Sequence, residues 1–223
     1  NRSFNRMVAD LAQLEQDRAV LLAGISHDLR TPLTRLRLEV EINALPEATR
    51  AAMIADIEQI DAIVGQFLDY ARPLPQQPRQ RLRLAGLIEA ALAQARLHDA
   101  RLNVEVDAAL EVPAHPTELA RALDNLLTNA ARYGRDPESG VLELTLTARR
   151  DGNDALIAVA DRGPGIAPEQ VDRLLRPFER GDAARGGARG AGLGLAIVDR
   201  VARLHGGSLR LTPNTPHGLR AEL

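Results

Sequence analysis

The chain has 223 residues, 45% of them hydrophobic and 26% charged, which is enough for one or two buried cores. With a formal net charge of -2, the chain lacks the positive electrostatic field that drives nonspecific binding to nucleic acids or membrane surfaces. Cysteine is absent, which excludes disulfides and thiolate chemistry, and all 28 basic residues are arginine, which excludes sites that need a P-loop lysine, a kinase strand lysine or a Schiff base.

Residues 8 to 72 predict two long helices joined at a break near Leu45 and Pro46, because proline suits a first helical turn. Apolar residues recur in each helix at spacings of three and four, which predicts one apolar seam per helix. A two-helix hairpin cannot enclose its own seams, so we expect it to double into a four-helix bundle as a homodimer. The seam residues are Leu22, Ile25, Leu29, Pro32 and Leu36 in the first helix and Met53, Ile57, Ile60, Val64, Phe67 and Ala71 in the second.

The first helix contains the sequence SHDLRTPL at residues 26 to 33. At about 100° per residue His27 lies opposite the seam, so its imidazole is expected to face solvent as a candidate nucleophile. The Asp28 carboxylate can fix the tautomer of that imidazole, while Pro32 lacks an N–H and is expected to bend the helix beside it. Taken alone, a histidine next to an aspartate is more often only a polar surface pair.

A linker is predicted at RPLPQQPRQR, residues 72 to 81, because three prolines interrupt any periodicity. Beyond it helices and strands mix, which predicts an α+β sandwich with one sheet and helices on one face. The glycine-rich segment 181 to 192 is predicted to be a mobile loop. Helices are expected near 84–97, 117–133, 168–175 and 192–205, and strands near 102–107, 141–149, 155–160, 208–212 and 218–223.

Two segments of this second part carry candidate nucleotide-binding residues. Asn125 and Asn129 lie one helical turn apart, so their amide oxygens share a face and can help to hold Mg²⁺ beside phosphates. Asp161 ends an apolar strand with an acceptor for an adenine amino group, and Gly163 and Gly165 permit close approach of the backbone to a base. Each pattern alone also fits an ordinary helix face or a tight turn.

Two further segments flank the glycine-rich stretch. RPFERGD, residues 176 to 182, supplies Phe178 and begins a loop whose arginines can reach phosphates, although any one of them can equally be a solvated loop residue. GAGLGLAIV, residues 190 to 198, runs glycines into a helix whose unpaired amides can bind phosphate oxygens. The arginines are Arg180, Arg185 and Arg189.

The string SHDLRTPL, after AQLEQDRAVLLAGI and before TRLRLEVE, resembles the phosphoacceptor box (HisKA) of two-component sensor histidine kinases, most closely those of the EnvZ osmosensor type. The resemblance implies that His27 is autophosphorylated, that Asp28 assists as a base and that Thr31 positions a water when a partner is dephosphorylated. It also implies that residues 1 to 18 end a signal-relay segment of the HAMP type; the alternative is an ordinary helical extension.

The order N-x-x-x-N, D-x-G-x-G, phenylalanine, then G-x-G-L resembles the N, G1, F and G2 boxes of the Bergerat-fold (HATPase_c) ATP-binding domain shared by histidine kinases, gyrase, Hsp90 and MutL. It implies that Asn129 is the principal Mg²⁺ ligand beside Asn125, that Asp161 reads adenine, and that residues 176 to 191 form an ATP lid. Further nucleotide-site residues implied are Arg132, a phosphate contact in place of the common lysine, Tyr133, a wall of the adenine pocket, and Gly163, Gly165, Ile166, Phe178, Arg180, Arg189, Gly190, Gly192, Leu193, Gly194 and Leu195.

Together the resemblances imply a multi-domain chain with a relay segment and connecting helix (1–18), a dimerisation and phosphotransfer domain (19–72), a linker (73–81) and a catalytic ATP-binding domain (82–223). They imply a bifunctional kinase that transfers a phosphoryl group from ATP to His27, then to an aspartate of an OmpR-type response regulator, and that also dephosphorylates that regulator. No run of 18 apolar residues occurs, and the abrupt polar start predicts a fragment, the cytoplasmic portion of a bacterial inner-membrane protein.

Asn125 separates the possible relatives. In the hydrolytic members a glutamate stands there as the general base for water, and an asparagine amide cannot take a proton, which argues against a dedicated ATPase. Two alternatives stay open: a Bergerat ATPase or serine kinase whose hairpin only dimerises, and a scaffold that binds nucleotide without turnover. The other histidines show no metal-ligand spacing and are expected to be structural or surface residues: His98, His115, His205 and His217.

Overall fold

The computed structural model describes residues 2–73, 75, 77–95, 97, 99–180 and 191–223. Up to residue 27 it describes only the side chains of Arg6, Met7, Asp17, Leu21 and Ile25, and the burial of Gly24. The chain forms two compact units, a helical hairpin made by the chain up to residue 74 and an α/β unit made by most of the chain from residue 75 onward. In the part of the chain that is described, no helix is long and apolar enough to cross a membrane.

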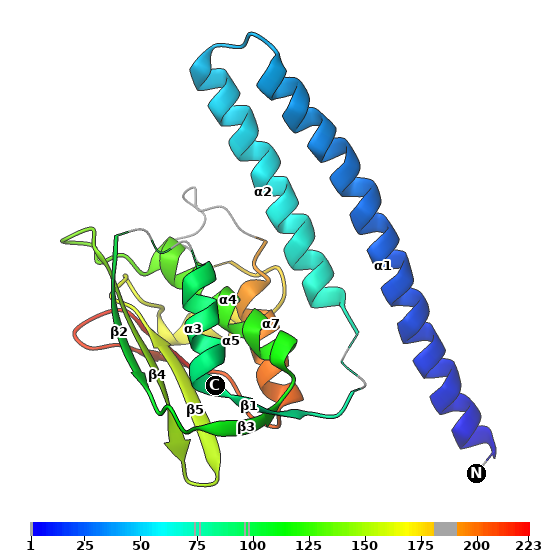
Figure 1. Ribbon diagram of the computed structural model, residues 1–223, viewed down its shortest axis with the longest axis vertical. Helices are drawn as coiled ribbons and strands as arrows, with labels where there is room; N and C mark the ends of the chain where they lie inside the picture. The colour runs from blue at the N-terminus through cyan, green and yellow to red at the C-terminus, as the bar shows by residue number, and fades with distance from the viewer. Residues whose placement is uncertain (1, 74, 76, 96, 98, 181–190) are drawn as a thin grey trace. The chain divides into compact units, whose positions relative to one another are not determined.

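The hairpin consists of α1 (Arg2–Ile42) and α2 (Glu47–Ala71), which run antiparallel (Figure 1). The predicted break is confirmed: Pro46 stands at the N-cap of α2, where its missing N–H costs nothing. The structure starts the first helix earlier than the expected residue 8 and continues it through Pro32. An ion pair of 3.4 Å between the Arg30 and Asp61 side chains joins the two helices.

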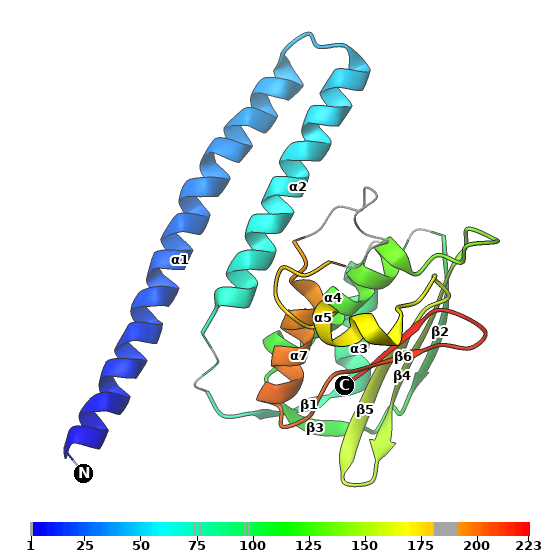
Figure 2. The ribbon, with the colours of Figure 1, turned by 180° about the vertical axis from the view of Figure 1, so that it is seen from behind.

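The α/β unit is built on a five-stranded sheet in the order β2-β4-β5-β7-β6, in which β2 and β4 are parallel and the other neighbours antiparallel. Helices α3, α4 and α7 lie on one face of this sheet (Figures 1 and 2), which confirms the predicted sandwich. The strands are β2 (Ala100–Val106), β4 (Leu142–Asp151), β5 (Asp154–Ala160), β6 (Arg210–Pro213) and β7 (Leu219–Glu222), and the helices α3 (Leu84–Gln94), α4 (Pro116–Tyr133) and α7 (Gly194–Leu204).

Alternation of buried and less buried residues along β4 shows which face of the sheet is the core. In β4, Leu142, Leu144 and Leu146 are buried, whereas Glu143 and Thr145 between them are half-buried on the other face. The amphipathic helices α4 and α7 bury their apolar residues in the same core, and the two helices pack on each other. These buried helix residues include Leu119, Leu123, Leu126 and Leu127 of α4 and Ile197, Val198 and Val201 of α7.

The structure corrects the sequence prediction in several places. A second, two-stranded antiparallel sheet of β1 (Gln80–Arg83) and β3 (Glu111–Ala114) was missed, because each strand has four residues, too few for a period-two signal, and β3 contains a proline. The predicted linker therefore runs two residues into β1. The helix expected near 168–175 is a 3₁₀ turn, η1 (Pro168–Gln170), followed by the short α5 (Val171–Leu174).

Candidate functional site

The two asparagines of α4 meet the start of α7. The Asn125 side chain is 8% exposed, and its Nδ2 donates a hydrogen bond to the carbonyl of Arg121 at 2.9 Å. A β-carbon on Gly194 would lie 3.2 Å from Asn125 Oδ1 and 3.3 Å from the Asn129 amide. Glycine at this position therefore lets the helix N-terminus approach both asparagines, and two segments separated by some 60 residues of chain form one site.

Asp161 lies directly after β5 and is 8% exposed. Its Oδ1 accepts hydrogen bonds from the backbone N–H groups of Gly163 at 2.9 Å and Leu219 at 3.0 Å. Burial raises the pKa of the Asp161 carboxyl, while these two donors favour its ionised form and act in the opposite direction. The backbone thus holds this carboxyl group in one orientation.

The turn after Asp161 packs on the end of α4. A β-carbon on Gly163 would collide with the carbonyl oxygen of Tyr133, and one on Gly134 would lie 2.7 Å from Asp161 Cβ. Gly165 has a φ of +72°, in the left-handed region that favours glycine. Gly163 in this turn and Gly134 at the end of α4 therefore allow the two segments to approach closely, in addition to any role of Gly163 toward a base.

A hydrogen bond of 2.9 Å from the Phe178 N–H to the Gly192 carbonyl joins the start of the predicted lid to the residue that follows its end. Gly192 has a φ of +71°, and a β-carbon there would lie 2.6 Å from the Glu179 carbonyl oxygen. The Phe178 ring is exposed, whereas Leu193, at the N-cap of α7, is fully buried. Arg185, Arg189 and Gly190 lie outside the described residues, as does most of the segment predicted to be a mobile loop.

The remaining predicted residues lie in α4, in the first turn of α7 and in the loops that follow β5 and α5. Arg132 and Tyr133 form the last turn of α4, with Arg132 exposed and Tyr133 half-buried. The others, all half-buried, are Ile166 in the loop after Gly165, Arg180 two residues after Phe178, and Leu195 in the first turn of α7.

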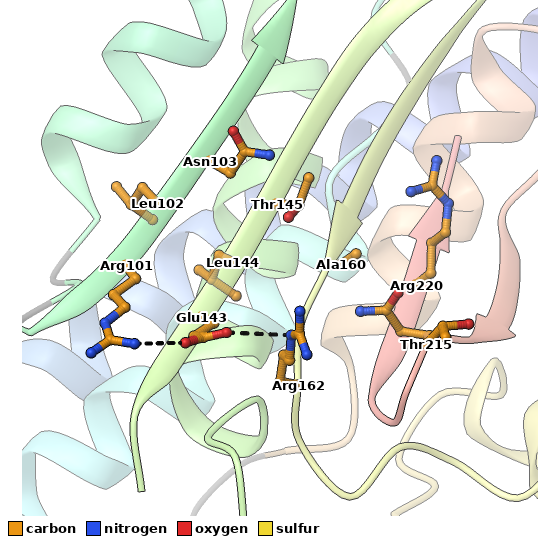
Figure 3. Close-up of a pocket in the computed structure, with 11 residues that line it drawn as sticks. Arg101, Leu102, Asn103, Glu143, Leu144, Thr145, Ala160, Arg162, Thr215 and Arg220 are labelled. Carbon is orange, nitrogen blue, oxygen red and sulfur yellow. Dashed lines mark hydrogen bonds and ion pairs between the residues drawn. The ribbon is translucent and has the colours of Figure 1, made fainter. Parts of the chain in front are cut away.

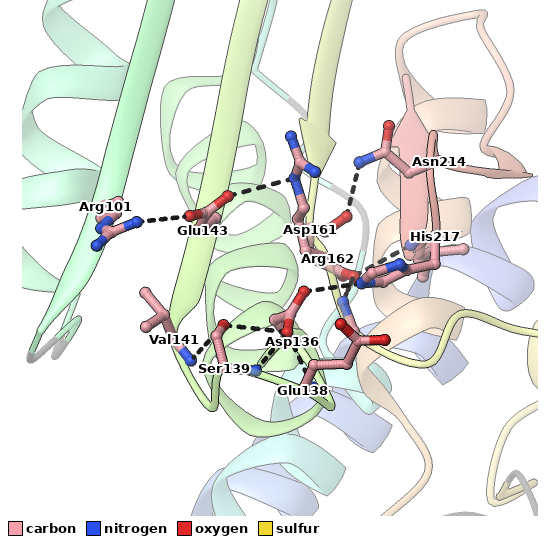
Figure 4. A network of polar contacts seen from close by, with 12 residues as sticks. Arg101, Asp136, Glu138, Ser139, Val141, Glu143, Asp161, Arg162, Asn214 and His217 are labelled. Atoms are coloured by element: carbon pink, nitrogen blue, oxygen red, sulfur yellow. Dashed lines mark hydrogen bonds and ion pairs between the residues drawn. The ribbon is translucent and has the colours of Figure 1, made fainter.

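The sequence did not reveal the support that the loop between β6 and β7 gives to Asp161. Asn214 Nδ2 donates to the Asp161 carbonyl at 2.7 Å (Figure 4). Gly218 has a φ of +117°, and a β-carbon there would collide with the same carbonyl oxygen. The sequence NTPHG between two predicted strands indicates a turn, but only the tertiary fold shows which residues this turn contacts.

A second contact fixes that loop. The His217 Nε2 lies 2.8 Å from Asp136 Oδ2, and Asp136 Oδ1 accepts from the Ser139 N–H at 2.7 Å (Figure 4). The Ser139 N–H, followed by His217, holds the pKa of the Asp136 carboxyl well below its usual range. His217 therefore tethers the β6–β7 loop to the loop that follows α4.

In the hairpin, Asp28 and Thr31 are exposed on α1 one turn apart. His27 belongs to the same helix, but its side chain is not described. The solvent-facing direction of the imidazole therefore stays a prediction. Along the predicted seams, large apolar side chains are exposed in the single chain. They include Ile25, Leu29 and Leu36 of α1 and Met53, Ile60 and Phe67 of α2.

Each of the two units matches the model of a known protein family. The model for histidine kinase-, DNA gyrase B- and HSP90-like ATPases matches residues 114–223, and that for the His Kinase A phospho-acceptor domain matches residues 17–75. The chain belongs to the sensor histidine kinases. The phosphoacceptor match contains the SHDLRTPL segment of this histidine kinase, and the ATPase match contains the paired asparagines, Asp161 and the start of α7.

Individual relatives agree with this assignment. The signal transduction histidine-protein kinase/phosphatase MprB of Mycolicibacterium smegmatis is 36% identical over 97% of this histidine kinase chain, which spans 46% of that relative. A solved mycobacterial sensor histidine kinase MprB is 27% identical, with a TM-score of 0.55 over 65% of this chain and 94% of that one. Full-length ShkA in complex with AMPPNP is 25% identical, with a TM-score of 0.69 over 92% of this chain and 45% of that one.

Proposed function

We propose that this histidine kinase transfers the γ-phosphoryl group of ATP to His27 and then to an aspartate of a response regulator. The observation that carries the proposal is the meeting of Asn125 and Asn129 with Gly194 in the α/β unit, on a chain whose first helix carries SHDLRTPL. ATP binding is the property expected of the matched ATPase family. The relatives named kinase/phosphatase support two activities, phosphorylation and dephosphorylation of a partner.

In the transfer step, a neutral His27 imidazole nitrogen attacks the γ-phosphorus. A nitrogen–phosphorus bond forms while the bond to the leaving oxygen of ADP breaks. The carboxylate of Asp28, the next residue, is proposed to orient the His27 imidazole and to stabilise the tautomer in which the non-attacking ring nitrogen carries the proton. Asp161 is proposed to accept a hydrogen bond from the adenine amino group, and the start of α7 to offer N–H groups to the phosphates.

The asparagine pair fits a magnesium ion. Because Asn125 Nδ2 is used by the Arg121 carbonyl, its Oδ1 is the atom turned toward Gly194, next to the Asn129 amide. Amide oxygens are hard ligands of the kind that Mg²⁺ accepts together with phosphate oxygens. When bound, the ion would offset negative charge on the transferring group, with Asn129 as the principal ligand and Asn125 beside it.

Incubation with γ-labelled ATP tests the proposal. The kinase reading requires label on the protein that is acid-labile and alkali-stable and that disappears in His27→Ala. The matched control is His98→Ala, which removes an imidazole that lies outside every nucleotide motif of the sequence and is expected to keep the label. Steady phosphate release without labelled protein would instead support an ATPase, the reading that Asn125 argues against because it cannot act as a base.

The phosphatase role is proposed for Thr31, which is exposed one turn after Asp28. Its hydroxyl would position the water that attacks the phosphorylated regulator. Thr31→Ala is expected to keep autophosphorylation near the wild-type rate and to slow dephosphorylation of the regulator by about a hundredfold. Thr34→Ala, one turn further along the helix, is the control, and equal loss of both activities in Thr31→Ala would contradict the role.

The partners and setting follow from the same reading. Histidine kinases with this phosphoacceptor domain act as homodimers and pair with response regulators; here we propose a dimer through residues 19 to 72 and a regulator of the OmpR type. The proposed domain order is a relay segment (1–18), a dimerisation and phosphotransfer domain (19–72), a linker (73–81) and a catalytic domain (82–223). We propose that the chain is the cytoplasmic part of a bacterial inner-membrane sensor; the relatives are named as bacterial signal transduction kinases.

A further inference from the structure

A trough of about 420 Å³ lies on the sheet, lined by side chains such as Glu143 and Thr145 that point away from the helix-covered core. Its lining side chains come from β2, β4, β5 and β7 and from the segments that follow β5 and β6 (Figure 3). Thr145 and Ala160, which are direct partners across β4 and β5, form part of the lining and are small. Small side chains at the middle of the trough leave room for the backbone of another chain.

Arginines give this trough a positive charge. Its lining holds three arginines, Arg101, Arg162 and Arg220, and one carboxylate, Glu143. Glu143 is shared: its Oε1 lies 3.0 Å from Arg101 Nη1 and its Oε2 lies 3.3 Å from Arg162 Nε (Figure 3). Because a guanidinium has five N–H donors, these contacts leave both arginines able to bind a further acceptor. The lining thus carries more positive than negative charge, although two carboxylates beside it offset part of the excess: Glu222 accepts from Arg220, and Glu105 accepts from Asn103.

The spacing of the arginines fits an extended peptide better than a small anion. Arg101 on β2 and Arg220 on β7 are separated by three steps between neighbouring strands, or about 14 Å. Glu222, two residues further along β7, accepts a hydrogen bond from the Arg220 Nε at 2.7 Å. A single phosphate cannot reach both, whereas side chains at alternate positions of an extended chain recur about every 7 Å and face one way.

We propose that this trough docks an acidic segment of a partner protein, extended and with carboxylates at alternate residues. The site lies behind the predicted adenine reader: Arg162 follows Asp161 in sequence, and Asn214 lines the trough while its Nδ2 donates to the Asp161 carbonyl at 2.7 Å. The proposal depends on the charges and shape of the sheet face, so it stands or fails independently of phosphoryl transfer.

The test uses the full 223-residue chain and a fluorescein-labelled peptide of about eight residues in which glutamate alternates with glycine, followed by fluorescence anisotropy at low salt. Arg101→Gln and Arg220→Gln are each expected to weaken binding about tenfold, since each removes a charge-assisted hydrogen bond. Arg81→Gln is the matched control, because Arg81 is an exposed arginine paired with Glu111 at 3.2 Å in the separate β1–β3 sheet; its binding should equal wild type.

Glu143→Gln provides a variant with the opposite expectation. It removes the carboxylate that competes for Arg101 and Arg162, so the peptide should bind several-fold more tightly. A peptide with glutamine for glutamate should not bind. Three results would overturn the proposal. The glutamine peptide could bind equally well, or the Arg101→Gln/Arg220→Gln double variant could keep its affinity while showing a wild-type thermal unfolding profile. Displacement of the peptide by inorganic phosphate at the same concentration would instead indicate a small-anion site.

Discussion

The two units of this histidine kinase differ in how completely each buries its own apolar residues. The α/β unit encloses its core, with Leu123, Leu144 and Ile197 each almost fully buried between sheet and helices. In the hairpin the seam residues Ile60 and Phe67 remain 48% and 39% exposed. An exposed apolar stripe on both helices is what a half-bundle shows before it pairs. We infer that the α/β unit folds by itself, while the hairpin is completed by a second copy.

The largest expected effect is a loss of nucleotide binding in the α/β unit that leaves dimerisation of the hairpin intact. Asp161→Ala removes the proposed adenine acceptor and should abolish labelling of His27 and weaken nucleotide binding about a hundredfold, because it also leaves the N–H groups of Gly163 and Leu219 without their acceptor. Asn129→Ala should abolish labelling as well. Autoradiography measures the label, and light scattering should show an intact dimer for both.

Asp161→Asn is the control for folding, since its amide oxygen can still accept from the two backbone N–H groups. It should restore the thermal stability lost in Asp161→Ala but leave nucleotide binding impaired. If either Asp161 variant dissociated into monomers, the two units would not be independent and the comparison would fail.

The second effect is on the hairpin alone. Ile60→Asp places a carboxylate in the seam, and burying it in a bundle should weaken the dimer by at least about a hundredfold. Ala62→Asp is the control, because Ala62 is exposed on the opposite side of α2 and lies outside the seam. Sedimentation measures the dimer, and nucleotide binding should stay at the wild-type level in both variants. A dimer unaffected by Ile60→Asp would show that the seam is not the contact.

The third effect tests the packing of the turn after Asp161. Gly163→Ala sets a β-carbon against the Tyr133 carbonyl and should destabilise the α/β unit by about 2 kcal/mol. Gly86→Ala is the matched control, because a β-carbon at Gly86, within α3, meets nothing within 4 Å and should stabilise the helix by up to about 1 kcal/mol. Urea unfolding followed by circular dichroism gives both values, and a neutral Gly163→Ala would mean that the turn can move away from α4.

How far the sequence could predict these features depends on the range of the interactions involved. Helical periodicity and an apolar strand are local signals, so α4, α7 and β5 were placed within a few residues of their observed ends. The meeting of Asn125 with Gly194 could be expected only through the order of motifs, because no local rule joins residues so far apart. Asn214 and the β1–β3 pair were missed because their contacts are made by tertiary structure alone.

The smallest expected effect is a pH dependence within the α/β unit. His205 Nε2 accepts a hydrogen bond from the backbone N–H of His115 at 3.0 Å, while its Nδ1 lies 2.8 Å from the Val201 carbonyl; a neutral imidazole satisfies this arrangement. Burial lowers the pKa of His205 below its ordinary value of 6.5, with the positive charge of Arg79 and a contribution from His115 acting in the same direction and Val201 and Glu118 opposing them.

A folded-state pKa below the unfolded value means that the unfolded chain takes up the proton first, so His205 contributes its full stability above about pH 6.5 and loses it as the pH falls toward the folded-state pKa. The urea midpoint of the wild type should therefore fall between about pH 7.5 and pH 5.5 more steeply than that of His205→Gln, which has no proton to gain. Parallel midpoints for the two proteins would show that His205 does not titrate differently on unfolding. A shallower fall in the wild type would reverse the sign and would mean that Glu118 and the Val201 carbonyl outweigh burial.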